Sequence, residues 1–365
     1  MTFTLTDTLL MARALQLAEQ GLFTTTPNPR VGCVLVKNGE VIGEGWHEHA
    51  GGPHAEINAL TAAKQAGHST NGATAYVTLE PCNHFGRTPP CVDALIEAGI
   101  VHVIAAMQDP NPQVSGEGLD KLNAAGIRVT CGLREGEATE LNIGFISRMT
   151  RNRPWVRLKV AASLDGMTAL NNGTSQWITG PEARRDAHAW RARSCAILTG
   201  YGTVKMDNPQ LTVREVDTPR QPLKVVVDSK LRISPDARIA EGNGLLVATA
   251  VMDETRASAL RQRGIEILTL PDASGKVDLL ALLKTLALRG INEVHVEAGH
   301  RLNGALLAEG LVDEFLIYQA PVLLGDLARG MFALPELTTL TDARRLNVLE
   351  RRFLGEDQFI RARPG

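Results

Sequence analysis

The chain is poor in aromatic residues, in excess charge and in long apolar runs, and each shortage excludes a class of protein. Aromatic residues make up 4% of the 365 residues, and the formal net charge is −2. Without a basic stripe, and with few aromatic rings on which bases could stack, we expect no nucleic-acid partner. No apolar run reaches the roughly 18 residues that a membrane-spanning helix requires, so we expect no membrane partner either.

Cysteine is also scarce, with five residues in the whole chain. A small, odd number argues against a disulfide framework and suits a reducing compartment. The first 20 residues contain neither a basic n-region nor a small-residue cleavage site. They predict instead an amphipathic helix that Asp7 caps and Gly21 ends. We therefore expect a cytoplasmic protein.

The length of the chain exceeds one ordinary core, so we expect two domains. In the first, apolar runs at 31–37 and 40–46 flank Asn38-Gly39, a dipeptide typical of a type I′ hairpin turn. Short β-rich runs then alternate with helical patterns, the former at 76–79, 101–107 and 127–130 and the latter at 54–66, 91–98 and 118–125. This alternation predicts about five strands, partly parallel, with helices on both faces.

A further helix is expected over 135–149, and the polar, basic stretch after it places the domain boundary at 150. The second half, 151–365, again alternates between β-rich and helical patterns. Strands are expected at 155–162, 196–199, 223–228, 245–250, 266–270, 293–297, 314–319 and 357–362, and helices at 181–193, 254–263, 277–289 and 301–309. The pattern predicts a second α/β domain with its own core.

A metal motif is the most specific signal in the first half: Pro53-His54-Ala55-Glu56, then Glu80-Pro81-Cys82, then Pro90-Cys91. One imidazole and two thiols are ligands that zinc prefers, and three protein ligands leave the fourth tetrahedral position free for water. Glu56 need not be a ligand. A carboxylate in that position shuttles a proton from water to the leaving amine in hydrolytic deaminases.

His54 and Glu56 stand two residues apart, so on a helix their side chains would point about 200° away from each other. They can share a site only if the metal lies off the amino end of that helix, and Cys91 after Pro90 predicts the same geometry. Two alternatives stay open: the residues are buried packing, or His84 closes a structural four-ligand site. Cys33, Cys131 and Cys195 are interpreted as packing residues.

Eight residues separate Cys82 from Cys91, where the commonest nucleoside and tRNA deaminases have two. With this spacing, the segments 26–32, 45–47 and 81–91 closely resemble the deaminase half of bacterial bifunctional riboflavin-biosynthesis deaminase/reductases. The segments 158–166, 175–179, 207–214 and 296–299 resemble the reductase half of that family. The resemblance implies a cytidine-deaminase-like three-layer α/β/α domain over 1–150 and a dihydrofolate-reductase-like α/β domain over 151–365.

The resemblance implies two successive reactions on phosphoribosylaminopyrimidine substrates. A zinc-dependent deamination removes the 2-amino group, and an NADPH-dependent reduction converts the ribosyl arm to a ribityl one. In the deaminase half it implies His54, Cys82 and Cys91 as zinc ligands and Glu56 as the proton shuttle. Substrate contacts are expected at Asn28, His47 and Arg87, although Arg87 alone reads equally as a solvated surface cation.

In the reductase half the resemblance implies cofactor contacts at Ala161, Trp177, Thr203, Asp207, Ser229, Gly299, His300, Arg301, Leu302, Asn303, Gly304 and Ala305. It implies substrate contacts at Ser175, Arg191, Leu211, Arg214 and Glu297. Two arginines can hold a phosphate in bidentate fashion. Lys159 and Glu297 are candidate catalytic residues, as proton donors or charge partners beside the sugar C1, although a strand-end lysine can also simply extend to solvent.

Apart from the resemblance, the sequence gives only weak signals for a dinucleotide cofactor. Gly200-Tyr201-Gly202 begins like a dinucleotide fingerprint, but Lys205 stands where the third glycine belongs. The stretch 299–304 fits either a phosphate cradle at a helix start or a plain strand-to-helix turn. Competing hypotheses are a nucleobase deaminase with an unrelated second domain and a zinc-stabilised scaffold. We also expect a homo-oligomer.

Overall fold

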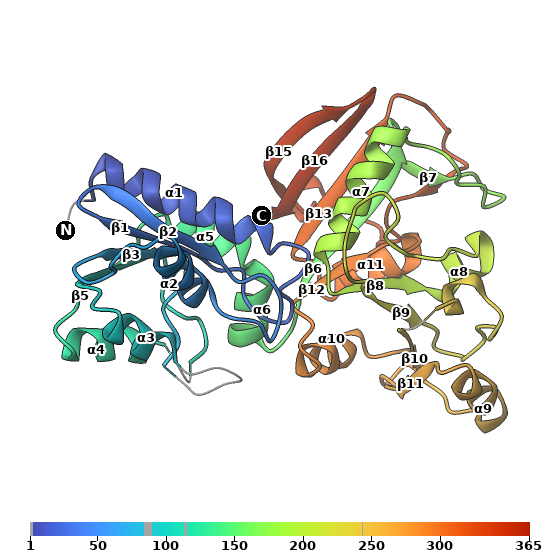
Figure 1. The fold of residues 1–365 in the computed structure, drawn as a ribbon. Coiled ribbons are helices and arrows are strands. Elements are labelled where there is room, and N and C mark those ends of the chain that lie inside the picture. The colour runs from blue at the N-terminus through green and yellow to red at the C-terminus, as the bar shows by residue number, and fades with distance from the viewer. Residues whose placement is uncertain (1–2, 84–89, 113–114, 243) are drawn as a thin grey trace. The chain divides into compact units, whose positions relative to one another are not determined.

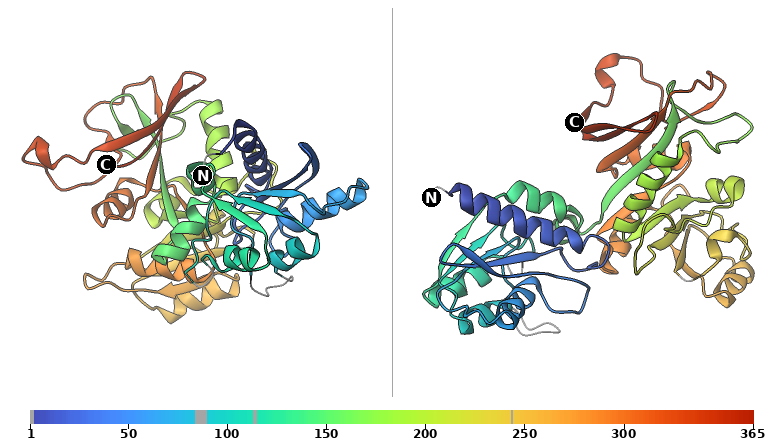
Figure 2. Two further views of the ribbon diagram at one scale, coloured as in Figure 1. Left: turned by 90° about the vertical axis from the view of Figure 1, so that its left-hand side faces the viewer. Right: turned by 45° about the horizontal axis from the view of Figure 1, so that its top comes forward.

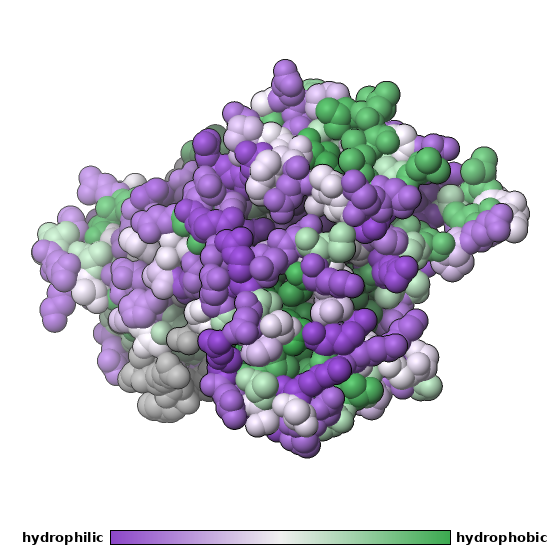
Figure 3. Space-filling model, turned by 90° about the vertical axis from the view of Figure 1, so that its right-hand side faces the viewer, coloured by the Kyte–Doolittle hydropathy of each residue, from purple (hydrophilic) through white to green (hydrophobic). Residues whose placement is uncertain are grey.

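The computed structural model describes residues 3–83, 90–112, 115–242 and 244–365. The chain forms two compact units, Met1–Asn152 and Arg153–Gly365. Among the described residues, no helix combines the length and the apolar character that crossing a bilayer requires. The face drawn in Figure 3 is mainly hydrophilic, with hydrophobic patches between the charged side chains.

The first unit is built on a five-stranded mixed sheet with the order β2-β1-β3-β4-β5. Its strands are β1 (Gly32–Lys37), β2 (Glu40–Trp46), β3 (Thr74–Val77), β4 (His102–Ala105) and β5 (Arg128–Cys131). The expected hairpin is confirmed: β1 pairs antiparallel with β2 around Asn38-Gly39, both of which have positive φ. β1 and β3 are antiparallel, whereas β3, β4 and β5 run parallel.

Helices cover both faces of this sheet, as Figures 1 and 2 show. α1 (Leu5–Gln20) and α5 (Glu135–Leu141) contact each other on one face, and α6 (Ile143–Arg151) follows α5. On the other face, α2 (Ala55–Gln65) contacts α3 (Cys91–Glu97), which contacts α4 (Glu117–Ala124). The three-layer arrangement predicted from the alternating pattern is therefore confirmed.

Two local predictions in this unit were wrong. The cap of α1 is Thr4, and Asp7 closes a capping box from the third helical position. The helix expected over 135–149 is interrupted at Asn142, whose buried side-chain amide accepts from Arg30 N–H and donates to the Arg30 carbonyl. A side chain that must reach another segment in this way sets the chain direction at the break.

Two glycines allow the helices to lie very close to the central strands. A Cβ on Gly32 would stand 2.0 Å from the Ala14 carbonyl oxygen in α1, and one on Gly45 would stand 2.4 Å from the Ala59 amide in α2. Any side chain at either position would push a helix away from the sheet. The position of α2, and with it of the metal motif at its amino end, therefore depends on the absence of a side chain in β2.

The second unit contains a nine-stranded sheet with the order β11-β10-β9-β8-β12-β6-β13-β16-β15. The strands are β6 (Trp155–Ser163), β8 (Ala196–Gly200), β9 (Leu223–Val227), β10 (Leu245–Thr249), β11 (Glu266–Thr269), β12 (Glu293–Val296), β13 (Glu314–Ala320), β15 (Leu346–Leu354) and β16 (Asp357–Pro364). From β11 to β13 all neighbours are parallel, and β16 and β15 add antiparallel.

Helices α10 (Leu279–Leu288) and α11 (His300–Ala308) pack with one face of this sheet into a core that includes Leu158 and Val296. On the opposite face, α9 (Glu254–Gln262) packs with β8, β9 and β10, and α7 (Pro181–Arg193) packs with β13 and β16. Figure 1 shows α7 lying along the sheet. The helices and strands predicted for this half are confirmed to within a few residues.

Sequence reasoning missed several elements here. They are α8 (Tyr201–Asp207), the small ladder between β7 (Met167–Ala169) and β14 (Arg329–Gly330), and the edge strand β15. The sequence of β15 has apolar residues at both ends and three charged residues, 350–352, between them, so it does not alternate regularly between apolar and polar residues as a half-buried strand does.

Candidate active sites

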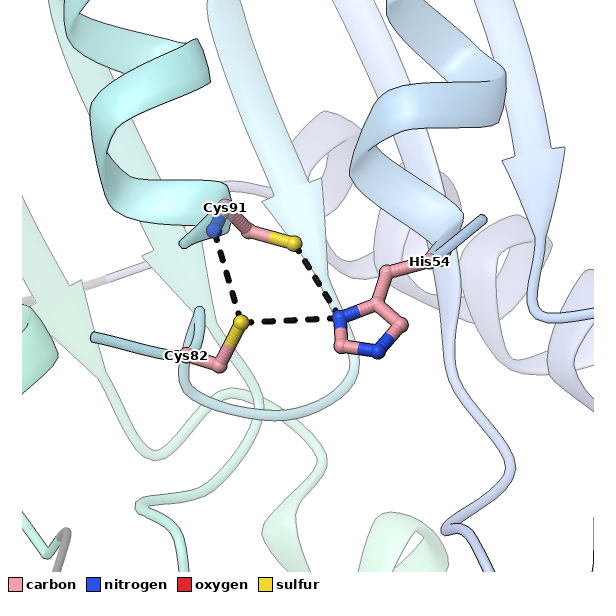
Figure 4. Close-up of side chains that lie close together, drawn as sticks. All are labelled: His54, Cys82 and Cys91. Carbon is pink, nitrogen blue, oxygen red and sulfur yellow. Dashed lines mark hydrogen bonds between the residues drawn. The ribbon is translucent and has the colours of Figure 1, made fainter. Parts of the chain in front are cut away.

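The ligands predicted for the metal converge in the first unit. His54 is the N-cap of α2 and has extended backbone, and Cys91 is the first residue of α3. His54 Nδ1 lies 3.2 Å from Cys91 Sγ and 3.5 Å from Cys82 Sγ. Figure 4 shows the imidazole directing Nδ1 at both sulfur atoms. The expected geometry, a site off the amino ends of two helices, is confirmed.

These distances fit a tetrahedral zinc site. Zinc bonds of about 2.1 Å to nitrogen and 2.3 Å to sulfur place the two donor atoms roughly 3.6 Å apart. The three donor atoms lie within 4.8 Å of one another, and among the described residues they form the one such cluster of histidine, cysteine and acidic side chains. Three converging donor atoms would leave a fourth position for water if they held zinc.

The electrostatics of the site favour one thiolate, at Cys82, whereas the hydrogen bond to Cys82 and burial raise the pKa of Cys91. The Cys91 thiol donates to Cys82, and this hydrogen bond with the one from His54 lowers the pKa of Cys82 to about 4. The backbone N–H of Cys91 also donates to Cys82 Sγ over 3.4 Å. Because a metal binds the thiolate form, Cys82 is already in the form that binds a cation, whereas Cys91 would release its proton when the metal binds.

Glu56 lies in the first turn of α2, two residues after His54, and only 3% of it is exposed. It is not part of the converging donor set. Burial, with a smaller contribution from the negative charge of Cys82, raises the pKa of Glu56 to about 7. A carboxyl group that titrates near neutral pH can take a proton from water and return it to a leaving group.

Asn28 and His47, the predicted substrate contacts, lie together beside the predicted metal ligand His54. The rings of His47 and His54 meet edge to face, with their centroids 5.3 Å apart. His47 Nδ1 lies 2.9 Å from the Pro53 carbonyl oxygen, which can only accept, so Nδ1 carries the proton. Nε2 therefore accepts from the Asn28 amide over 3.0 Å. Arg87 and His84 lie outside the described residues.

Sequence reasoning missed Glu80. Its buried carboxylate accepts four backbone N–H groups, from Asp109, Gly116, Gly118 and Leu119. A carboxylate saturated in this way fixes two segments against each other, and one of them continues directly into Pro81-Cys82. The available signal was an acidic residue immediately before a Pro-Cys ligand.

In the second unit, the carboxyl ends of the central strands hold a cluster of charged residues. Glu297, directly after β12, receives Nε–H of Arg191 from α7, and the Arg191 Nη2–H reaches its second oxygen over 2.9 Å. Burial opposes ionisation, but Arg191 keeps the pKa of Glu297 well below its ordinary value. Burial lowers the pKa of the Lys159 ammonium group in β6. The charge of Glu297 opposes this shift, and the charge of Arg191 adds to it.

Arg214 belongs to the same cluster through its neighbours in the chain. The third nitrogen of Arg191, Nη1, donates to the Thr212 carbonyl over 3.0 Å. The Arg214 backbone N–H donates to Nδ1 of His188, and its exposed guanidinium reaches the Thr212 hydroxyl. Leu211, three residues before Arg214, is buried in the core that α9 covers. Sequence reasoning missed His188, although it stands one helical turn before Arg191.

Predicted cofactor residues form a second group near α8 and α11. Ser175 donates to Asp207 over 3.3 Å, and a Cβ on Gly299 would meet only Thr203, at 3.8 Å. Gly299 caps α11 without a side chain, so no side chain of the cap residue accepts from the amide groups at the start of the helix. A pyrophosphate fits such a helix start.

The other residues predicted to contact the cofactor are spread more widely over the second unit. His300 begins α11, and Leu302 packs against Gly200. A Cβ on Gly304 would stand 2.2 Å from the Ala333 carbonyl oxygen, so close packing requires glycine at this position. Trp177 is 70% exposed with Arg184 over its ring. The others are Ala161 in β6, Ser229 after β9, exposed Arg301, buried Asn303 and half-buried Ala305.

Comparisons with known proteins match both units. Residues 5–107 match the cytidine and deoxycytidylate deaminase zinc-binding region, and residues 154–356 match the RibD C-terminal domain. The chain is 50% identical to the riboflavin biosynthesis protein RibD of Escherichia coli, over 96% of this chain and 97% of that protein. The chain belongs to the RibD family. It is therefore an enzyme of riboflavin biosynthesis, with a zinc-dependent deaminase domain and an NADPH-dependent reductase domain.

Solved structures agree with this assignment. Acinetobacter baumannii RibD superimposes with a TM-score of 0.91 at 42% identity, covering 99% of both chains. A diaminohydroxyphosphoribosylaminopyrimidine deaminase/5-amino-6-(5-phosphoribosylamino)uracil reductase from Thermotoga maritima gives a TM-score of 0.88 at 36% identity, again over 99% of both chains. The predicted fold class and family are confirmed.

Proposed function

We propose that this RibD-family chain first hydrolyses 2,5-diamino-6-(5-phosphoribosylamino)pyrimidin-4-one. Water replaces the 2-amino group, and 5-amino-6-(5-phosphoribosylamino)uracil and ammonia are formed. The same chain then reduces the ribosyl arm of that uracil to a ribityl arm with NADPH. The observation that carries the proposal is the convergence of His54, Cys82 and Cys91 beside a buried, non-ligating Glu56.

In the first reaction His54, Cys82 and Cys91 would hold zinc, which supplies an acidified water at neutral pH. Glu56 takes a proton from that water and passes it to the departing amine, a role that its pKa of about 7 supports. Asn28 and the neutral His47 line the same place and would orient the pyrimidine by hydrogen bonds. Arg87 stays a proposed phosphate contact.

In the second reaction NADPH, when bound, would supply a hydride to C1 of the opened sugar. Glu297 is ionised beside Arg191, so we assign it to stabilising positive charge at C1 rather than to proton donation. Lys159, whose pKa is lowered by burial, is the better proton donor. Arg214 and Arg191 would hold the substrate phosphate, with Ser175 and Leu211 completing the substrate site.

The two units would be the two catalytic domains, divided near residue 150, with NADPH between α8 and the start of α11. The proposed cofactor contacts are those that the family resemblance implies: Ala161, Trp177, Thr203, Asp207, Ser229 and 299–305. We also propose a cytoplasmic location, because a metal site with two thiolate ligands requires reduced cysteines and all five cysteines are free.

We propose a homo-oligomer that uses β15. This nine-residue strand is the edge of the large sheet and exposes Leu346, Val348, Leu349 and Phe353. An exposed apolar edge strand favours pairing with another copy. Light scattering after gel filtration should give a molar mass that is a multiple of the 39.3 kDa chain. Phe353→Lys should lower that molar mass toward the value of the monomer. A monomeric wild-type protein would refute this assembly.

The experiment that tests the function follows ammonia and NADPH separately. Glu56→Gln should abolish ammonia release from the diamino substrate while zinc stays bound, because Glu56 is not a ligand. The same variant, given the deaminated substrate, should oxidise NADPH at the wild-type rate. Loss of that second activity in a folded, zinc-loaded variant would show that the two reactions do not use separate sites.

A further inference from the structure

His188 is a buried histidine within the charged cluster of the reductase domain. It lies on α7, one helical turn before Arg191, and only 6% of it is exposed. The charges that act on it belong to Arg191, Arg214, Glu297 and Lys159, the groups proposed to handle the substrate. Neither the proposed binding of substrate nor the proposed chemistry uses its imidazole.

One hydrogen bond fixes which nitrogen carries the proton. The backbone N–H of Arg214 donates to His188 Nδ1 over 3.2 Å, so Nδ1 is the acceptor and the proton of the neutral ring is on Nε2. Among the described residues Nε2 has no hydrogen-bond partner. It is also not one of the buried unpartnered polar atoms, so it reaches the surface of the domain. The ring is buried, but its Nε2–H donor keeps contact with solvent.

The ring is uncharged at neutral pH. Burial, followed by the positive charges of Arg191 and Arg214, lowers the pKa of His188 to about 4. A neutral imidazole can accept from the backbone on one side and donate on the other at the same time. A protonated imidazole would lose the bond to Arg214, because both of its nitrogens donate.

The same bond ties the segment that carries Arg214 to α7. Two residues of α7 hold this segment: His188 through the Arg214 N–H, and Arg191 through the Thr212 carbonyl. These two hydrogen bonds hold the backbone from which the Arg214 side chain extends. The guanidinium also lies close enough to His188 for its positive charge to lower the pKa of the imidazole.

We propose that His188 binds the phosphate end of the reductase substrate through Nε2–H and positions Arg214 through Nδ1. The proposal rests on the assignment of Arg191 and Arg214 to the substrate phosphate. It adds an uncharged donor to a site that sequence reasoning described with arginines alone. A hydrogen bond to a charged oxygen is stronger than one between neutral groups, so the expected effect on binding is about tenfold.

Two variants separate binding from folding. His188→Leu keeps a similar volume and removes both hydrogen bonds, whereas His188→Gln keeps one acceptor and one donor. His188→Leu should raise the KM of the uracil phosphate substrate about tenfold and leave the KM of NADPH near wild type. His188→Gln should restore most of the substrate KM. Competitive inhibition of the reductase by inorganic phosphate should weaken in the leucine variant and return in the glutamine variant.

An unchanged substrate KM in His188→Leu would overturn the proposal, as would equal losses for substrate and NADPH in both variants, which indicate a structural role. A raised KM with unchanged phosphate inhibition would also overturn it, because the donor would then serve another part of the substrate. Arg214→Ala tests the underlying assignment separately. If that variant leaves KM and phosphate inhibition unchanged, the arginine assignment fails while the two His188 variants still decide the role of His188.

Discussion

Arg191 and Glu297 form a two-point ion pair that joins α7 to the carboxyl end of β12, across 106 residues of sequence. The third nitrogen of the guanidinium holds the Thr212 carbonyl. Both side chains are largely buried, with 13% and 12% exposed. One arginine therefore places a carboxylate that we assign to chemistry and a loop that we assign to substrate binding.

Replacing Glu297 by Gln should remove the negative charge while keeping the shape of the side chain. We expect the reductase kcat to fall by about 100-fold or more, the range for removing a preorganised electrostatic group. Deamination should be unchanged, because its residues lie in the other unit. NADPH oxidation and ammonia release measured on the same preparation check this. Glu336→Gln, a change at an exposed glutamate of the same unit, is the matched control.

Zinc binding should depend on two of the five cysteines. Cys91→Ser should lose most of the roughly one zinc ion per chain, because a hydroxyl is a poor substitute for a thiolate ligand. Cys131→Ser should retain it. The sequence predicted that Cys131 is a packing residue, but this was wrong: its thiol is exposed, because it ends β5, a strand that is exposed at both ends. The zinc content of both variants, measured by mass spectrometry after dialysis, tests this prediction. Full occupancy in Cys91→Ser would mean that the metal is bound elsewhere.

The stability of the reductase domain should fall in mild acid. The pKa of His188 is about 4 in the folded chain and about 6.5 for an unfolded imidazole, so the unfolded chain binds more protons between these values. His188 therefore favours folding fully above pH 6.5, and its contribution decreases as the pH drops toward 4. Unfolding by urea at stepped pH should show a shallower decline for His188→Gln. Parallel curves would contradict the lowered pKa.

The metal centre could be predicted from sequence because its geometry is local. Pro53 and Pro90 each precede a helix start, and this alone places His54 and Cys91 at the amino ends of two helices. Strands with continuous apolar runs, such as β9 and β10, were equally predictable, because burial on both faces leaves a plain compositional signal.

What could not be predicted depends on contacts between distant residues. Nothing near Asn142 in sequence indicates that its amide must meet the Arg30 backbone and interrupt a helix. The four backbone donors of Glu80 come from residues about 30 to 40 positions later. His188 shows its role only once the Arg214 segment lies across α7. Such contacts are set by the tertiary structure, which local periodicity does not describe.

The close approach of α2 to β2 leads to a last prediction, about stability and metal binding together. In Gly45→Ala the new Cβ would stand 2.4 Å from the Ala59 amide and 2.7 Å from the Ala55 carbonyl oxygen, so α2 must move. Overpacking of this kind costs about 1–3 kcal/mol. Since His54 and Glu56 stand at the amino end of α2, zinc affinity and deamination should fall with stability, while reduction is spared.

The matched control is Gly136→Ala in α5 of the same unit, where a Cβ meets nothing within 4 Å and φ is not positive. Alanine in a helix is favoured over glycine by about 0.5–1 kcal/mol, so this variant should be as stable as wild type or more so. Thermal unfolding, zinc content and ammonia release measured on both variants provide the comparison. If Gly45→Ala behaved like Gly136→Ala, the spacing between α2 and β2 would not control the metal centre. A loss of deamination confined to Gly45→Ala would show that a glycine without any chemistry of its own sets the position of the catalytic residues.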